Sequence, residues 1–368
     1  MRMKKKVTFS LTAGIILSAI ALYLALKNVP VSELIQYFAT INYFWGIPSV
    51  IIVLICFFLR AVRWRIILDA SEKMSIWRAF HPLMIGFMIN CVLPGRVGEV
   101  ARPVILKKKE KIPFTTGLAT VAAERVFDIC MLVLFFIVTF SAIQINPDLD
   151  VKFGDHHLNR ATLENVFSGM IKLGIVLIVG MVMISIGKIR KFIHAVIMAL
   201  PKLFFFADQQ FKAGLTKKCC EPLITLVENI AEGFNLIRYP KKMLLCFIFS
   251  LIIWGLHVLS YYIFSLGSPG IDLNLVELTA VMVIIMFFIA LPSVPGFWGL
   301  WEAGGVFALA LFGVSSKDAA GFTLANHAIQ MFPIIIAGIV SATIVSVNIW
   351  QLSYQKEKYL QQNSSMES

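Results

Sequence analysis

Long apolar stretches separated by short basic segments run through most of this sequence. Six of them reach the roughly 20 residues that an α-helix needs to cross a bilayer. They lie at about residues 7–27, 43–62, 115–142, 168–187, 243–264 and 322–349. Each stretch therefore predicts a membrane-spanning helix. The first follows basic residues as a signal peptide does, but its length and the lack of a small-residue cleavage pattern predict a retained span.

Two further apolar stretches are each interrupted near the middle by a Pro-Gly pair. Residues 94–95 divide the stretch 79–106, and residues 295–296 divide the stretch 276–312. Proline removes a backbone donor and glycine frees the turn, so lipid cannot satisfy the backbone groups exposed there. Because each half is also too short to cross a core of about 30 Å, both stretches predict re-entrant helical hairpins rather than spans.

Basic residues gather at the ends of the apolar runs. The clusters lie at residues 2–6, 60–65, 107–111, 188–191, 212–218, 241–242 and 356–358. The positive-inside rule places all of them, and both termini, in the cytoplasm. The segment 79–106 then begins and ends on the cytoplasmic side, whereas 276–312 begins and ends on the outer side.

The order span, span, hairpin, span consequently occurs twice along the chain. An odd number of crossings in each half turns the second copy upside down relative to the first, which is the inverted-repeat architecture of secondary transporters. We expect the first repeat at 1–142, an extracytoplasmic loop at 143–167 and the second repeat at 168–349, followed by a cytoplasmic tail at 350–368. The two hairpin tips would meet from opposite leaflets.

Residues 188–242, between the fourth and fifth spans, form a basic cytoplasmic segment with apolar residues near helical spacing. Amphipathic helices on an anionic leaflet have this pattern, and so do connector helices packed on a bundle. In the outer loop, the adjacent His156 and His157 are expected to be solvated loop residues, because two neighbouring histidines chelate one metal poorly without further ligands.

The composition agrees with a lipid solvent. Hydrophobic residues make up 58% of the 368 residues and charged residues 15%, against about 25% in soluble domains. The net charge of +12 comes from the clusters at helix ends, which predicts no nucleic-acid binding. The six cysteines show no Cys-x-x-Cys or Cys/His spacing, so we expect no disulfide framework, no metal site and no other cofactor.

The first hairpin carries the strongest candidate chemistry. After Gly95 the predicted helix places Arg96, Glu99 and Arg102 along one stripe, with Gly98 close to the break. A helix start with free N–H groups and two arginines favours binding of an anion such as phosphate. The alternative is that Glu99 only neutralises the arginines and locks the hairpin. Charges inside a membrane favour the functional interpretation.

The third span carries Glu124, Arg125 and Asp128 ahead of an unbroken apolar run. Each charge near mid-bilayer costs about 2.5 to 3.5 kcal/mol, so these groups must be paired. Arg125 can reach Asp128 three residues on. The remaining net acid would meet Arg96 or Arg102 of the hairpin. The alternative is that the whole group snorkels to the cytoplasmic surface.

The second hairpin carries one charge, Glu302, close to Trp298 and to small residues that permit close helix packing. Tryptophans near a helix break are more often packing residues or interfacial anchors than ligand-stacking residues, so Glu302 is the better candidate. In the last span, His327 shares a turn with Asn326 and Gln330. A lone buried histidine is usually only hydrogen-bonded, and these polar neighbours add weight to a functional role.

These elements, in this order, resemble the transmembrane domain of the lysylphosphatidylglycerol synthase and flippase-like family. The residues that carry the resemblance are Leu93-Pro94-Gly95-Arg96-Val97-Gly98-Glu99 with Arg102-Pro103, then Glu124-Arg125-x-x-Asp128, then Leu291-Pro292-Ser293-x-Pro295-Gly296-x-x-Gly299 with Glu302. The resemblance covers nearly the whole chain.

The resemblance implies a stand-alone flippase-like protein. In fused family members this domain moves aminoacylated phosphatidylglycerol from the inner to the outer leaflet, while a soluble domain is the aminoacyltransferase, so we do not expect synthase activity here. Family members often carry an arginine early in the last span. This chain has Asn326 and His327 there, so the resemblance leaves the substrate charge on the outer side open.

The sequence contains no nucleophile elbow, Walker loop, HExxH motif or aspartate-rich donor site, so we do not expect an enzyme. We predict an all-α polytopic protein of the inner cell membrane, with spans and re-entrant hairpins in an inverted repeat. It would act as a flippase-like transporter that moves a phospholipid or related anionic amphiphile between leaflets. Its substrate-binding residues would be Gly95, Arg96, Gly98, Glu99, Arg102, Glu124, Arg125, Asp128, Pro295, Gly296, Gly299, Trp298, Glu302 and His327.

Two alternatives stay open. The first is a membrane-embedded transferase acting on a lipid phosphate, with Glu99 or Asp128 as the base. The second is a non-catalytic subunit whose segment 188–242 recruits a separate lipid-modifying enzyme. The sequence also leaves a homodimer open.

Overall fold

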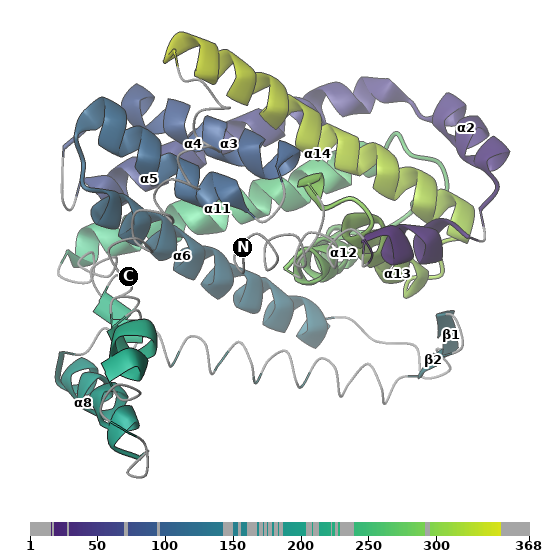
Figure 1. Ribbon diagram of the computed structural model, residues 1–368. Helices are drawn as coiled ribbons and strands as arrows, with labels where there is room; N and C mark the ends of the chain where they lie inside the picture. Colours follow the sequence, from purple (N-terminus) through teal and green to yellow (C-terminus); the bar gives the residue numbers. More distant parts are fainter. Residues whose placement is uncertain are drawn as a thin grey trace.

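The computed structural model is built almost entirely from α-helices (Figure 1). The principal helices are α2 (Val31–Thr40), α3 (Gly46–Leu68), α4 (Ile76–Val92), α5 (Val97–Glu110), α6 (Phe114–Ala142), α8 (Gly187–Leu203), α11 (Pro240–Ser265), α12 (Leu275–Phe288), α13 (Leu300–Ala310) and α14 (Ser316–Ile344). The residues described are 16, 18–27, 29–69, 73–93, 96–142, 150–153, 156–159, 168, 172, 175, 179, 183, 187–203, 208, 213–221, 223–224, 227–228, 239–290 and 295–346.

Within these residues, three segments are long and apolar enough to cross a membrane, namely Tyr43–Leu68, Pro240–Ser265 and Ser316–Ile344. A fourth span results if Ser18–Leu26 and Val31–Thr40, which are bent by 75°, count as one broken span. These helices coincide with the second, fifth and sixth predicted spans and confirm a multi-pass helical membrane protein. The third predicted span is the continuous helix α6. Much of the first and most of the fourth lie outside the described residues.

Both predicted breaks separate pairs of short helices. α4 packs against α5, and α12 packs against α13. Gly98 permits the first close approach, because a Cβ added there would lie 1.8 Å from the carbonyl oxygen of Gly86. At the second break, Gly296 and Gly299 have φ values of 69° and 88°, in the left-handed region that favours glycine. The breaks are therefore where the sequence placed them, whereas the re-entrant course through a membrane stays a prediction.

The contacts between helices come in related pairs. The helices α3, α4, α5 and α6 correspond in order to α11, α12, α13 and α14. Wherever two of these helices are in contact, their two counterparts are in contact as well. The matched contacts are α3–α4 and α11–α12, α3–α6 and α11–α14, α3–α14 and α6–α11, α4–α5 and α12–α13, α4–α14 and α6–α12, and α5–α6 and α13–α14. α3 and α11 run antiparallel, because Ser49 Oγ donates to the Ser260 carbonyl near one end (2.8 Å) and Lys242 Nζ donates to the Asp69 carbonyl near the other (2.9 Å). The two halves of the chain thus use the same packing scheme.

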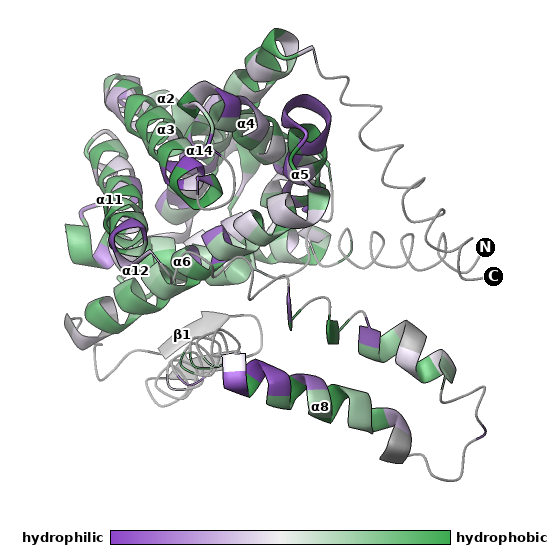
Figure 2. Ribbon diagram, turned by 90° about the vertical axis from the view of Figure 1, so that its left-hand side faces the viewer, coloured by the Kyte–Doolittle hydropathy of each residue, from purple (hydrophilic) through white to green (hydrophobic). Residues whose placement is uncertain are grey.

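Large apolar side chains cover much of the outward surface of the bundle. Figure 2 shows hydrophobic residues along α3, α11 and α14. Exposed examples are Ile47, Ile51, Ile55 and Phe58 on α3, Leu244, Ile248 and Leu251 on α11, and Phe332, Ile336 and Val340 on α14. Such a surface is unfavourable in water and favourable in contact with lipid tails.

The segment 143–167 is not entirely a loop. It contains two antiparallel strands, β1 (Asp150–Phe153) and β2 (His156–Asn159), in which His156 is opposite Phe153 and His157 is opposite Lys152. The expectation that His156 and His157 lie in a plain loop is therefore wrong, whereas the principal elements of the described fold are helices, as predicted. The Gly-Asp pair between the strands is a turn signal that an argument based on long apolar runs overlooks.

The helix α2 was not predicted either. At 10 residues it is too short to count as a span, and it buries only Leu34 and Tyr37. Tyr37 connects it to the second half of the chain, because its hydroxyl donates to the Pro269 carbonyl oxygen over 3.0 Å. α8 begins the basic segment 188–242 as a helix, and much of the remaining segment lies outside the described residues.

Candidate substrate-binding site

A buried network of arginines and carboxylates lies where α3, α5 and α6 meet. Arg63 is at its centre, with Nη2 at 2.9 Å from Asp128 Oδ1 and 3.2 Å from Glu124 Oε1. Arg60, one turn earlier on α3, lies 3.3 Å from Asp128 Oδ2. Arg102 of α5 pairs through Nη1 with Glu124 Oε2. The helical spacings put both arginines of α3 on one face and both carboxylates of α6 on another, so the two faces meet.

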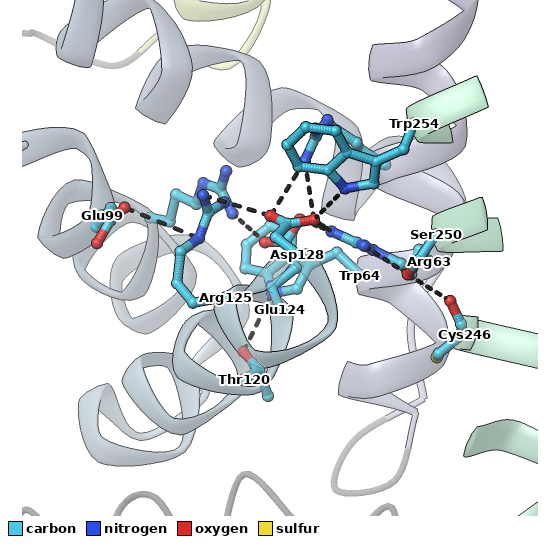
Figure 3. Close-up of polar contacts among 12 residues, drawn as sticks. Arg63, Trp64, Glu99, Thr120, Glu124, Arg125, Asp128, Cys246, Ser250 and Trp254 are labelled. Atoms are coloured by element: carbon cyan, nitrogen blue, oxygen red, sulfur yellow. Dashed lines mark hydrogen bonds and ion pairs between the residues drawn. The ribbon is translucent and has the colours of Figure 1, made fainter. Parts of the chain in front are cut away.

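α11 completes the network from the second half of the chain. Ser250 Oγ accepts a hydrogen bond from Arg63 Nη1 at 2.7 Å and itself donates to the Cys246 carbonyl at 2.6 Å. Trp254 Nε1 lies 3.4 Å from Asp128 Oδ1. Figure 3 shows these α11 side chains approaching the ion pairs from the side opposite Glu99. The network therefore bridges the two repeats that the sequence predicts.

Arg125 forms the more accessible edge of the network. Its Nη1 lies 3.4 Å from Asp128 Oδ2, and its Nε lies 3.8 Å from Glu99 Oε1 (Figure 3). The side chains of Arg125 and Glu99 are 31% and 27% exposed, whereas those of Arg63 and Glu124 are completely buried. A ligand would therefore reach the network first at Arg125 and Glu99.

The network is rich in positive charge. Arg60, Arg63, Arg102 and Arg125 face the carboxylates of Glu99, Glu124 and Asp128, which leaves one net positive charge when every group is ionised. Several buried guanidinium nitrogens also have no hydrogen-bond partner among the described residues. They are Nε of Arg60, Arg63 and Arg102, and Nε and Nη2 of Arg125. Buried donors are normally paired, so this geometry favours an additional acceptor, preferably an anion.

An aromatic ring lies beneath three of these cations. The centroid of Phe87 on α4 is 4.4 Å from Arg102 Cζ, 5.8 Å from Arg60 Cζ and 5.9 Å from Arg125 Cζ. The faces of aromatic rings attract cations, so Phe87 compensates part of the cost of keeping guanidinium groups away from water. The first hairpin thereby supports the network as well as contributing Glu99 and Arg102.

The structure brings together five of the sequence-predicted site residues, Glu99, Arg102, Glu124, Arg125 and Asp128. The predicted contact between Arg125 and Asp128 is present. Glu124 is completely buried, so the alternative in which the group snorkels to the surface is wrong for this carboxylate. The predicted net acid on α6 is offset by the arginines of α3.

Arg96 does not join Arg102 as expected. It is in the left-handed conformation (φ 52°) and precedes the first turn of α5. Its guanidinium donates to the Ile289 carbonyl at 2.8 Å and lies 5.9 Å from the centroid of Phe297, so it contacts the second hairpin. The expectation of one anion site built from both arginines and the helix start is therefore wrong. The contact does bring the two hairpin tips together, as the sequence predicted.

The remaining candidates have other surroundings. Gly98 donates its N–H to Asn90 Oδ1 (2.7 Å) and belongs to the close contact between α4 and α5. Gly95 lies outside the described residues. The other candidates lie around the second break. Pro295 and Gly296 belong to the short 3-10 helix Pro295–Phe297, Trp298 and Gly299 follow it, Glu302 is on α13 and His327 is on α14.

Sequence reasoning missed Arg60 and Arg63. Both were assigned to a cytoplasmic cluster at the end of a span expected to finish at residue 62, but α3 continues to Leu68 and carries them into the bundle. A signal was available, because Arg60, Arg63 and Trp64 share a helix face with buried apolar residues, whereas Arg65 does not. Phe87, Ser250 and Trp254 carried no sequence signal of their own.

Comparisons with known proteins show to which family the chain belongs. Residues 11–338 match the family model of the lysylphosphatidylglycerol synthase TM region. The glycosyltransferase AglD of Haloferax volcanii is 24% identical over an alignment of 375 positions, which covers 95% of this chain and 56% of AglD. A UPF0104 membrane protein of Methanocaldococcus jannaschii is 25% identical over 274 residues, which are 74% of this chain and 99% of that protein.

A UPF0104 membrane protein of Pyrococcus horikoshii is 23% identical over 287 residues, or 76% of this chain and 81% of that protein. The chain spans little more than half the length of AglD. No solved structure matches it significantly. Because one family model covers most of the sequence, the chain belongs to the lysylphosphatidylglycerol synthase transmembrane-region family.

Proposed function

We propose that this protein is a flippase-like transporter that binds the anionic head group of a phospholipid at the arginine network. The observation that carries the proposal is that guanidinium N–H groups of Arg60, Arg63, Arg102 and Arg125 have no hydrogen-bond partner in the described part of the chain. Phosphate oxygens are the acceptors that such donors prefer. The net positive charge of the network favours the same class of ligand.

The position of the network supports a lipid rather than a soluble anion. Glu124 is the eleventh residue of α6, about 15 Å along a helix of 29 residues, and a bilayer core is about 30 Å thick. The surrounding helices expose large apolar side chains. A head group could reach Arg125 while its acyl chains stay among those side chains. We place the protein in the cell membrane with both termini in the cytoplasm.

The matched helix contacts support alternating exposure. The same packing scheme occurs in both halves, and α3 and α11 are antiparallel, as an inverted repeat requires. We propose six spans and two re-entrant hairpins on this basis. Rocking one half against the other would change the access to the network, because α11 contacts it from the second half.

A liposome assay tests this proposal. Purified protein would be reconstituted into vesicles of phosphatidylcholine and phosphatidylglycerol. These vesicles would contain phosphatidylglycerol with an acyl-chain label and an intact head group. Dithionite added outside bleaches the label of each lipid that reaches the outer leaflet, so the bleaching rate reports the movement. We expect Arg125→Gln to slow this movement severalfold, while Asp128 keeps Arg60 and Arg63 as partners. Arg65→Gln is the control, since Arg65 pairs with Asp69 near the end of α3 and, among the residues that the structure describes, has no ion pair with the network. Equal rates for wild type and Arg125→Gln would refute the assignment.

A non-enzymatic role fits the chemistry of the network. A carboxylate held by two or three guanidinium groups is a poor general base, and Asp128 and Glu124 are both held in this way. Glu99, whose one ion-pair partner among the described residues is Arg125 at 3.8 Å, is the carboxylate of the network best suited to proton abstraction. The transferase alternative therefore depends on Glu99.

The similarity to AglD favours a second candidate function. That relative is named a glycosyltransferase, and 44% of its length lies outside the match. We infer that this family domain can also serve as the membrane part that holds a lipid-linked substrate for a transferase. A protein with only this role would bind anionic lipid without moving it between leaflets, so the dithionite assay separates the two.

A further inference from the structure

A second buried polar group lies on the hairpin of α12 and α13, apart from the arginine network. His327 of α14 has its Nδ1 at 2.6 Å from Glu302 Oε1 and its Nε2 at 2.8 Å from the Gly296 carbonyl oxygen. The other carboxylate oxygen of Glu302 accepts the Gly299 N–H at 2.6 Å. His327 and Glu302 are both almost completely buried.

Counting hydrogens assigns the protons of this group. A backbone carbonyl can only accept, so His327 Nε2 must carry a hydrogen. The 2.6 Å contact between Nδ1 and Glu302 requires one more hydrogen between them, either as imidazolium with carboxylate or as imidazole with carboxylic acid. Without that hydrogen, two lone pairs would face each other at this distance. The contact therefore exists only while the pair holds its proton.

We propose that Glu302 and His327 form a proton-binding site that locks the second hairpin to α14. The inference rests on the proposed function, because it supplies the ion that would drive lipid movement. Proton release would break the Glu302–His327 contact, and the pair anchors the loop at the Gly296 carbonyl and the Gly299 N–H. The tip of this loop also contacts α4, and Arg96 bonds to Ile289. The proton would thus control how the two hairpin tips meet.

The aromatic surroundings fit a charge at this position. The ring of Trp301 stacks on His327 with centroids 4.5 Å apart and an interplanar angle of 3°, and the ring of Trp298 lies at 4.4 Å. Aromatic faces stabilise a cation that is away from water. Trp298, which the sequence offered as a substrate-binding candidate with packing or anchoring as the commoner role, lies against the imidazole of His327.

The elements packed against α13, α14 and the loop carry further titratable or charged groups. They include Arg96 and Cys91 at the first hairpin tip, Arg60 and Arg63 on α3, His81 on α4, His257 and Tyr261 on α11, Glu277 at the start of α12, Glu33 on α2, and Lys317 and Asp318 at the start of α14. Arg96 donates to Ile289, and Glu277 and Asp318 belong to helix caps. Glu302 is the acid that contacts His327 directly.

A corresponding contact between α5 and α6 in the first half helps to explain why the proton site is assigned to the second half. Arg102 of α5 pairs with Glu124 of α6, and Glu302 of α13 pairs with His327 of α14, so equivalent helices carry a buried contact between a carboxyl group and a basic side chain in each half. An arginine keeps its proton at any physiological pH, whereas a histidine exchanges it. The first pair is therefore permanently charged, and the second can respond to protons.

Nitrogen NMR of the imidazole rings tests the proton site directly. The chain has six histidines, and His327→Gln would assign the His327 signals in protein labelled with [15N]histidine and held in lipid nanodiscs. We expect Nδ1 to titrate while Nε2 stays protonated. In Glu302→Gln the amide would donate to Nδ1 and hold the contact without an exchangeable proton, so the titration should disappear. Glu277→Gln is the control and should titrate like the wild type.

Either of two NMR results would overturn the proposal: no titration of His327 Nδ1 in the wild type, or the same titration in Glu302→Gln. A second experiment imposes a pH gradient on the vesicles with labelled phosphatidylglycerol. The gradient should accelerate movement in the wild type and in Glu277→Gln but not in Glu302→Gln. If labelled lipid moves in none of the samples, the proposed transport fails, while the NMR titration still decides the proton site.

Discussion

Replacing Asp128 with asparagine is the sharpest test of the arginine network. The substitution keeps the shape of the side chain, so it leaves no cavity, and it removes only the negative charge. Asp128 faces Arg60, Arg63 and Arg125 and accepts from Trp254. Glu124 would then be the remaining buried carboxylate among these arginines.

The expected loss of stability follows from these contacts. A polar contact between membrane helices is worth about 0.6 kcal/mol on average, and three partners of Asp128 lie on other helices (Arg60, Arg63 and Trp254), so these contacts set a lower bound near 2 kcal/mol. Removing one partner from a buried ion pair costs about 3–5 kcal/mol, because the other charge stays buried. We therefore expect Asp128→Asn to lower the free energy of unfolding by about 2–5 kcal/mol. The ratio of folded to unfolded protein would fall at least about thirtyfold.

Unfolding of the purified protein in mixed micelles, titrated with sodium dodecyl sulfate and followed by circular dichroism, measures this loss. Asp69→Asn is the control, because Asp69 pairs with the exposed Arg65, and such surface pairs contribute at most about 1 kcal/mol. Removing Arg125 as well should restore part of the stability, since one unpaired cation disappears with it. If Asp128→Asn and Asp69→Asn unfold alike, the arginines do not depend on this carboxylate and the electrostatic argument is wrong.

The other predictions concern packing and topology. Gly98→Ala should prevent α4 and α5 from packing together and should sharply lower the yield of folded protein, because the added Cβ would overlap the Gly86 carbonyl. Gly255→Ala is the control and should fold normally, because open space surrounds Gly255. Size-exclusion chromatography after detergent extraction distinguishes the two variants. In a cysteine-free background, Lys109→Cys should react with an impermeant maleimide only from the cytoplasmic side and Ser316→Cys only from the outside. Labelling of both from one side would contradict the proposed topology.

Some site residues could be predicted because their neighbours lie within one or two turns of the same helix. The spacing of Arg125 and Asp128 predicted their contact, and the cost of unpaired charge in a membrane predicted that Glu124 would need an arginine. The glycines at the breaks predicted where the hairpins turn. Arg60 and Arg63 escaped the same reasoning, because a basic cluster at the end of an apolar run has the same composition whether it faces the cytoplasm or the core.

The sequence by itself determined the solvent, the long apolar helices and the position of both breaks, since these depend on local hydrophobicity and on the backbone properties of proline and glycine. Only the tertiary structure decided which charges meet. It placed α3 and α11 beside α6, separated Arg96 from Arg102, and set His327 between Glu302 and a carbonyl. Those contacts join residues far apart in the chain, and the angle at which helices pack, which no local pattern records, determines them.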